Sequence, residues 1–179
     1  MVSKAYEEVD LETYSPRFWR EILTSYTYSM MALGRAEDAL NAIAPVATNP
    51  KYLGRLAPVE RSYFLVAYAG ALDLADQGEK ALEAMMQARQ ALPSEHYRGG
   101  APMAYVLQQE AFMNFDHERY ETAYLAMARS NDVFFNFQEE QLASNGEIAR
   151  NRRAEIDRVV SQAVLGWALA NQMKEAESR

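Results

Sequence analysis

The residues of this chain that could do acid–base or metal chemistry are few and scattered. Its two histidines, His96 and His117, fall in a loop and a turn, without a cysteine or another histidine at ligand spacing. Asp73 and Asp76 lie near an expected helix end, whereas acid–base catalysis needs carboxylates that converge in a pocket. Gly99–Gly100 lacks the remaining residues of a phosphate-binding loop. We therefore expect no catalytic residue, no metal site and no cofactor, and we interpret both histidines as exposed turn residues.

The basic residues near the C-terminus are the remaining charged cluster. Acidic residues are interspersed among them, so we favour an ion-paired, solvated helix face over an anion site. The basic residues are Arg150, Arg152, Arg153 and Arg158, and the acidic ones are Glu147, Glu155 and Asp157.

Composition narrows the classes of partner. The 179 residues carry a net charge of −7, which repels phosphate backbones and argues against nucleic acid as a partner. There is no cysteine, which fits a reducing compartment. The N-terminus has no apolar run, and the most apolar late stretch, Val159–Ala170, is shorter than the ~20 residues of a membrane span. We expect a cytoplasmic protein that does not enter a membrane.

The elements that must position any site are helices. Apolar residues recur at steps of three and four, which predicts amphipathic helices. In the first such segment they are Phe18, Trp19, Ile22, Leu23, Tyr26, Met30 and Leu33. No sustained strict alternation of apolar and polar residues indicates a strand, and Val133–Phe137 is expected to continue a helix. The predicted fold class is all-α.

The helices form repeating units. Pro16, Pro58 and Pro102 stand where a first helical turn tolerates proline. Ala39, Ala81 and Ala123 follow one another at intervals of 42 residues, each near the start of a second helix. Short turns are expected around Gly34, Gly78 and Asp116, and longer loops at Asn49–Ala57 and Pro93–Ala101. One register in three units indicates an array of helical hairpins.

The second unit resembles a tetratricopeptide repeat (TPR). In Ala67–Pro93, AYAGALDLADQGEKALEAMMQARQALP, and just before it, the family positions are matched by Leu65, Tyr68, Ala69, Leu72, Ala81, Met85, Ala88 and Pro93. The first unit matches at Leu23, Tyr26, Ala39 and Ile43, with Thr27 and Val46 at the small positions. The third matches at Leu107, Ala111, Tyr120, Ala123 and Met127, with Ser130 for the second alanine. The interval of 42 exceeds the usual ~34 residues and resembles longer-loop variants.

The resemblance implies an array of about three hairpins followed by a long C-terminal helix. The expected organisation is an N-terminal extension (1–15), repeats at 16–57, 58–101 and 102–144, and a C-terminal helix at 145–179. Two interpretations of that helix stay open, because it either caps the array or transmits a signal. In the second case the chain resembles the N-terminal TPR input module of a bacterial signalling protein such as a GGDEF-type diguanylate cyclase or a kinase. The helix would then mediate a homodimer.

The best candidate site is the concave groove that the first helices of TPR hairpins line. The family register places aromatic residues there, and aromatic rings are frequent binding anchors. The predicted groove residues are Tyr28, Tyr63, Val66, Tyr105, Gln108, Phe112 and Phe115, accompanied by Glu21, Thr24, Met31 and Asp73. Thr24, Val66 and Gln108 replace the family's carboxylate clamp. We therefore expect a non-enzymatic module that binds an apolar peptide or protein segment, with packing between helices as the alternative role for each residue.

Overall fold

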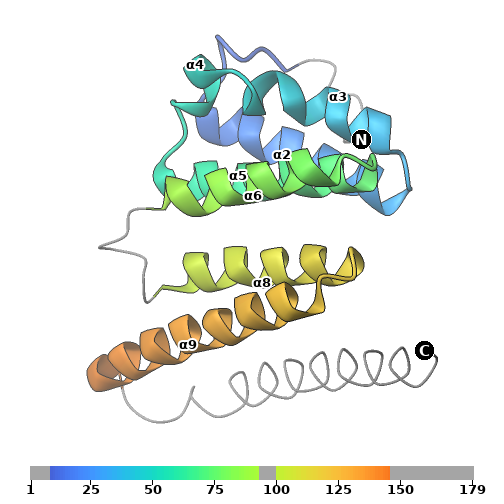
Figure 1. Cartoon of the computed structure of the whole chain (residues 1–179). Helices are drawn as coiled ribbons and strands as arrows, with labels where there is room; N and C mark the ends of the chain where they lie inside the picture. Colours follow the sequence, from blue (N-terminus) through green and yellow to red (C-terminus); the bar gives the residue numbers. More distant parts are fainter. Residues whose placement is uncertain (1–8, 93–99, 146–179) are drawn as a thin grey trace, which may run out of the picture. The chain divides into compact units, whose positions relative to one another are not determined.

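The computed structural model describes residues 9–92 and 100–145, and every regular element in these ranges is a helix (Figure 1). The chain divides into two compact units, Met1–Pro93 and Ser94–Arg179, which are described separately below. The prediction of an all-α fold is confirmed for the described residues. The N-terminal residues 1–8, the segment 93–99 and most of the predicted C-terminal helix, 146–179, lie outside them.

Unit 1 contains two long helix pairs and one short helix. They are α2 (Pro16–Ala32), α3 (Ala36–Ala47), α4 (Pro50–Leu53), α5 (Pro58–Leu74) and α6 (Gly78–Ala91). Helix α5 packs against α2, α3 and α6, so the second pair stacks on the first (Figure 1). Unit 2 contains α8 (Ala101–Asp116) and the 26-residue α9 (Tyr120–Asn145), which pack along each other. Residues Val133–Phe137 lie within α9, as expected.

Proline lies at the start of three helices where the sequence predicts it, and nearby side chains accept hydrogen bonds from amides of the first turn. Pro16, Pro58 and Pro102 all lie at the first or second helical position. The Ser15 side chain accepts a hydrogen bond from the Phe18 amide at 3.4 Å, and the Glu60 carboxylate accepts one from the Ala57 amide at 3.3 Å. Such bonds satisfy amides that the first helical turn leaves without a partner.

The backbone repeats with a period of 42 residues. Helices α2, α5 and α8 end at Ala32, Leu74 and Asp116, and their partners start at Ala36, Gly78 and Tyr120. In each connecting turn an amide donates to a carbonyl five residues earlier: Arg35 to Met30, Gln77 to Leu72 and Arg119 to Asn114, at 2.8–2.9 Å. This is the Schellman pattern, which closes a helix with one residue in the left-handed conformation. That residue is Gly34, Asp76 and Glu118 in turn.

Small residues allow the helices of each pair to approach. Ala39, Ala81 and Ala123 are at most 2% exposed, and Ala88 is fully buried. In unit 1 the larger core residues surround Trp19 and Phe64, whose rings meet edge to face at 6.0 Å. Ser130 occupies the position of the second alanine in unit 2. It donates a buried hydrogen bond to the Ala104 carbonyl at 2.7 Å, so its hydroxyl is satisfied across the α8–α9 contact.

The prediction that Asn49–Ala57 is only a loop was wrong, because it contains helix α4. Asn49 caps α4 by accepting from the Lys51 amide at 3.0 Å, and Pro50 is its first residue. Arg61 of α5 donates to the carbonyls of Leu53 and Leu56, both at 3.1 Å, which satisfies groups that the short helix leaves open. The short turn expected around Gly78 is confirmed: it falls at residues 75–77, and Gly78 is the first residue of α6.

Candidate functional site

Two residue pairs show where α2 and α5 lie side by side. Near the helix starts, Arg20 Nε of α2 lies 3.8 Å from Glu60 Oε1 of α5. Near the helix ends, Met31 Cε would lie 2.7 Å from a Cβ placed on Gly70, so this methyl group covers the bare backbone of α5. We call the strip between these contacts the α2–α5 seam.

Two of the predicted groove tyrosines lie beside this seam. Tyr28 comes one helical turn before Met31, and Tyr63 comes two turns before Gly70, so each shares a helix face with a seam residue. The Tyr28 side chain is 44% exposed, and Tyr63 is half-buried. The exposed ring of Tyr28 therefore adds apolar surface beside the place where the Met31 methyl group covers Gly70.

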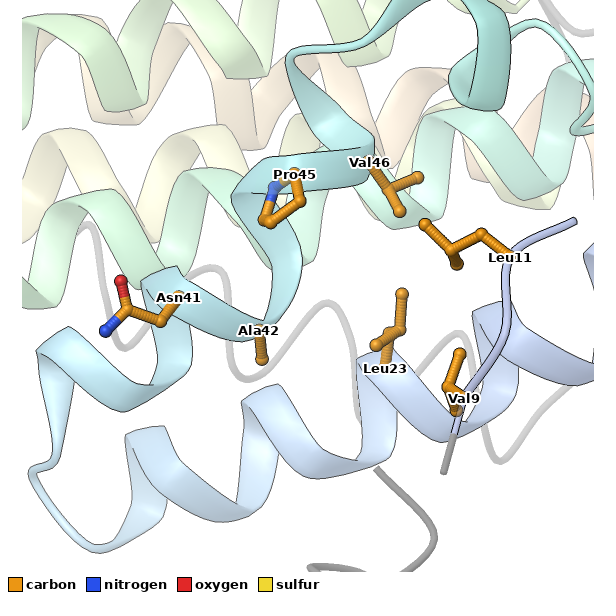
Figure 2. A pocket seen from close by; sticks show the side chains of 7 residues that line it. All are labelled: Val9, Leu11, Leu23, Asn41, Ala42, Pro45 and Val46. Atoms are coloured by element: carbon orange, nitrogen blue, oxygen red, sulfur yellow. The ribbon is translucent and has the colours of Figure 1, made fainter. Parts of the chain in front are cut away.

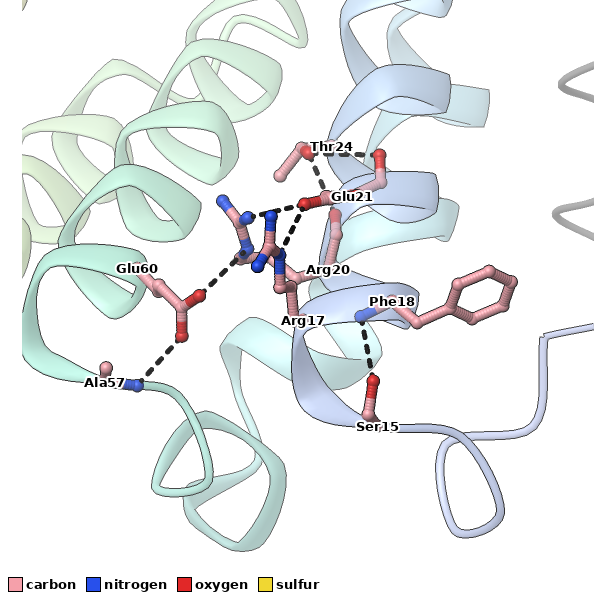
Figure 3. Close-up of polar contacts among 8 residues, drawn as sticks. All are labelled: Ser15, Arg17, Phe18, Arg20, Glu21, Thr24, Ala57 and Glu60. Carbon is pink, nitrogen blue, oxygen red and sulfur yellow. Dashed lines mark hydrogen bonds and ion pairs between the residues drawn. The ribbon is translucent and has the colours of Figure 1, made fainter.

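Charged residues occupy the start of the seam (Figure 3). The Glu21 carboxylate accepts from Arg17 Nε at 3.2 Å and from Arg20 Nη2 at 3.3 Å, while Arg20 also faces Glu60. Of these pairs, Arg17–Glu21 has both side chains largely exposed and contributes little to stability. Their effect is to give one end of the seam a polar border of both signs, with the apolar and aromatic residues beyond it.

The remaining predicted groove residues of unit 1 offer less surface. The Thr24 hydroxyl donates to the Arg20 carbonyl of its own helix at 2.8 Å, as Figure 3 shows, so its polar atom turns toward the backbone. Val66 is only 4% exposed, although its register places it near the seam. Asp73 is half-buried at the C-terminal end of α5.

The other four predicted groove residues belong to α8 in unit 2. Phe112 packs against the small cluster of Ala111, Ala126 and Met127, and the Phe115 ring meets Tyr120 at 5.5 Å. Tyr105 and Gln108 are half-buried on the same helix. Packing within the α8–α9 pair thus accounts for part of the surface of both phenylalanines. A single groove that runs through both units stays a prediction.

Unit 1 also has two hollows that the sequence does not indicate. One, of about 260 Å³, lies between residues of the N-terminal segment and helices α2 and α3 (Figure 2). The other, of about 370 Å³, is lined by Tyr68, Lys80 and Glu83 among others. Burial, and to a lesser degree the negative charge of Glu83, raises the pKa of the Tyr68 phenol.

The sequence also gave no sign of the contacts made by the N-terminal segment. The Glu12 carboxylate accepts hydrogen bonds from Lys51 and Tyr52, and the Leu11 carbonyl accepts one from Arg55. Each of these contacts joins residues about 40 positions apart. Their only sequence signal is the spacing of Lys51 and Arg55 by four residues, which is common on any exposed helix.

Candidate chemistry elsewhere in the chain stays sparse. Among the described residues no group of three or more His, Asp or Glu side chains is arranged to hold a metal ion. Within the same ranges no helix has the length and apolarity to cross a membrane. His117 is half-buried at the C-terminal end of α8, while His96 and the cluster from Arg150 to Arg158 lie outside the described residues.

Comparisons of the chain with protein-family models, with curated proteins and with solved structures find no match. The resemblance to tetratricopeptide repeats therefore stays a prediction that rests on the residues named above.

Proposed function

We propose that the chain is a non-enzymatic interaction module that binds an apolar peptide or protein segment along the α2–α5 seam. The observation that carries this proposal is the position of exposed Tyr28 beside the Met31–Gly70 contact. Tyrosine supplies a rigid apolar ring with a polar tip, which suits it to anchor a partner.

Met31 gives the seam a way to adapt. A methionine side chain is flexible and polarizable, so it can leave Gly70 at small cost and repack on an incoming apolar group. Movement of Met31 would open a depression over Gly70 that accepts one apolar side chain of the partner, flanked by Tyr28 and Tyr63. The charged border at Arg17, Arg20 and Glu21 would fix the direction in which the segment lies.

The test begins with peptides selected from a random library on the immobilised 179-residue chain, and their affinities are then measured by calorimetry. We expect Tyr28→Ala with Tyr63→Ala to raise Kd by about tenfold or more, because buried aromatic anchors carry much of the energy of an interface. Gly70→Ala should also weaken binding, since its methyl group enters the depression while favouring the helix. The Kd of the variant Tyr63→Ala with Phe112→Ala tests whether α8 contributes to peptide binding.

The matched control is Tyr124→Ala with Leu125→Ala on α9, where the side chains are 44% and 58% exposed. This pair removes exposed apolar side chains from a helix of unit 2, which does not form the seam. The proposal would be contradicted if Tyr28→Ala with Tyr63→Ala and Gly70→Ala both kept the wild-type affinity and helicity. An equal loss of affinity in the control pair would contradict it as well.

A further inference from the structure

Residues Val9–Tyr14, which we call the strap, lie on unit 1 in the manner of a bound peptide. Val9 and Leu11 are half-buried and pack against the core of unit 1. Figure 2 shows both side chains turned toward Leu23, Pro45 and Val46 of helices α2 and α3. The hollow of about 260 Å³ that remains between them shows that the strap does not fill the surface it covers.

Arg55 binds the main chain of the strap rather than its side chains. Its Nη1 donates to the Leu11 carbonyl at 2.5 Å, and its Nη2 donates to the Tyr14 carbonyl at 3.4 Å. The guanidinium group presents several donors in a fixed plane, so it can bridge two carbonyls three residues apart. Because every peptide has carbonyls, this contact is available to other segments of similar conformation.

A second contact selects an acidic side chain. The Glu12 carboxylate accepts hydrogen bonds from Lys51 Nζ at 2.5 Å and from the Tyr52 hydroxyl at 2.9 Å. One residue away, Leu11 packs on the apolar surface. The site therefore recognises an apolar residue followed by an acidic one. Arg55 adds a hydrogen bond to the main-chain carbonyl of the apolar residue.

The strap holds its own bound conformation through Asp10. The Asp10 carboxylate accepts from the Glu12 amide at 2.9 Å and from the Thr13 hydroxyl at 2.5 Å, and its carbonyl accepts from the Tyr14 amide at 3.0 Å. An acidic residue before the apolar one thus bends the segment toward Arg55. This is the local turn chemistry expected of aspartate.

The polar anchors of the strap are open to solvent. The side chains of Lys51 and Glu12 are 64% and 57% exposed, and exposed pairs of this kind add little to stability and weaken with salt. Val9 and Leu11 are only partly buried. A segment held in this way can exchange with a competitor of the same chemistry without unfolding the helices beneath it.

We propose that the surface under the strap is a second peptide-binding site, for a linear segment of a partner protein in which apolar and acidic residues alternate, as they do in Val9–Glu12. The site consists of the apolar face at Leu23, Ala42 and Val46 and the polar group of Lys51, Tyr52 and Arg55. The strap occupies this site in the structure and would compete with the partner segment for it. This site is distinct from the α2–α5 seam, so an experiment can refute either proposal without refuting the other.

The test uses the 179-residue chain and a fluorescent peptide with the sequence of residues 8–15, EVDLETYS. In the double variant Leu11→Ser with Glu12→Gln the strap loses the apolar anchor of Leu11 and the acidic anchor of Glu12 and keeps only Val9 on the core. We expect this variant to bind the peptide about tenfold more tightly than the wild type, because the strap no longer occupies the site. Adding Arg55→Gln to the double variant should abolish that gain. Binding should also weaken as salt concentration rises.

The control peptide carries the same two substitutions, serine for leucine and glutamine for glutamate. Equal affinity of both peptides, equal binding to the wild type and the double variant, or binding that is indifferent to Arg55→Gln would overturn the proposal. If the double variant loses its helical circular dichroism, the wild-type chain decides the question by NMR. Saturable shifts of the Val46, Lys51 and Tyr52 amides on titration with the peptide support the site, and their absence overturns it.

Discussion

Asp76 and Glu118 lie 42 residues apart in the sequence and adopt the same left-handed backbone conformation, with φ of 59° and 60°. The equivalent residue of the first helix pair is Gly34, with φ of 69°. In each turn the amide of this residue donates to a carbonyl three positions earlier at 3.0 Å. The fold thus imposes one turn geometry on three different residues, although only glycine adopts it without strain.

The first prediction follows from that strain. Glu118→Gly should raise the free energy of unfolding by about 1 kcal/mol, because a side chain at positive φ is disfavoured. Asp76→Gly should raise the free energy of unfolding by less, since aspartate tolerates this conformation better than glutamate does. Urea unfolding of the 179-residue chain measures the change in stability of both variants. The control Glu83→Gly, in the middle of α6, should cost about 1 kcal/mol, and a loss of stability in Glu118→Gly would show that its side chain makes compensating contacts.

The second prediction concerns the close approach of α5 and α6. Ala81 is fully buried, so Ala81→Glu forces a carboxylate into an interface that has no room or partner for it. We expect a loss of more than about 3 kcal/mol, seen as a large drop in the melting temperature. Gln90→Glu introduces the same side chain at an exposed position of the same helix and should change little. A wild-type melt for Ala81→Glu would mean that the helices pack in another register.

The third prediction tests the buried hydrogen bond from Ser130 to Ala104. Ser130→Ala removes the donor at 2.7 Å and should cost about 1 kcal/mol. Ser29→Ala is the matched control, because the Ser29 hydroxyl donates at 2.8 Å to the Ser25 carbonyl of its own exposed helix face. The control should be neutral or slightly stabilising, since alanine favours the helix. Equal effects in chemical denaturation would show that the contact between α8 and α9 adds nothing.

The fourth prediction concerns the charge of the strap. The hydrogen bonds from Lys51 and then Tyr52 hold the pKa of Glu12 below its ordinary value of 4.5, and the same contact with Glu12 raises the pKa of Lys51 above 10.5. The pKa of Asp10 is also lowered, first by the Thr13 hydroxyl. Both carboxylates therefore favour the attached strap above pH 4.5 and lose that effect as pH falls through their lower folded values. The Lys51 contribution is lost in turn as pH rises through its raised value.

NMR titration of the Glu12 carboxyl carbon measures this directly. The midpoint should lie below 4.5 in the wild type and move up toward that value in Lys51→Met. Lys80 of α6 donates its hydrogen bond to Gln77 instead, so Lys80→Met should leave the Glu12 midpoint unchanged. A Glu12 midpoint that ignores Lys51→Met would show that the strap is not held by this pair in solution.

Local signals predicted much of the fold. Proline at three helix starts, apolar residues at helical spacing, and alanines at intervals of 42 act within a few residues of chain, so the sequence alone indicated the long helices of the described part and their period. It placed helix α4 in a loop because four residues carry too little periodicity to be recognised. The turn that it indicated around Gly78 lies just before that glycine, where the Schellman hydrogen bonds place the left-handed residue at Asp76.

The sequence by itself determined the all-α class, the helix pairs and the candidate aromatic residues, because helix periodicity and turn chemistry are properties of neighbouring residues. Only the tertiary structure decided how much surface each candidate offers: Tyr28 is exposed while Val66, of the same predicted set, is buried. It also decided that Arg55 reaches Leu11 and that Met31 covers Gly70. Those contacts join residues about 40 positions apart, and their distance in space depends on how the helices stack rather than on any local pattern.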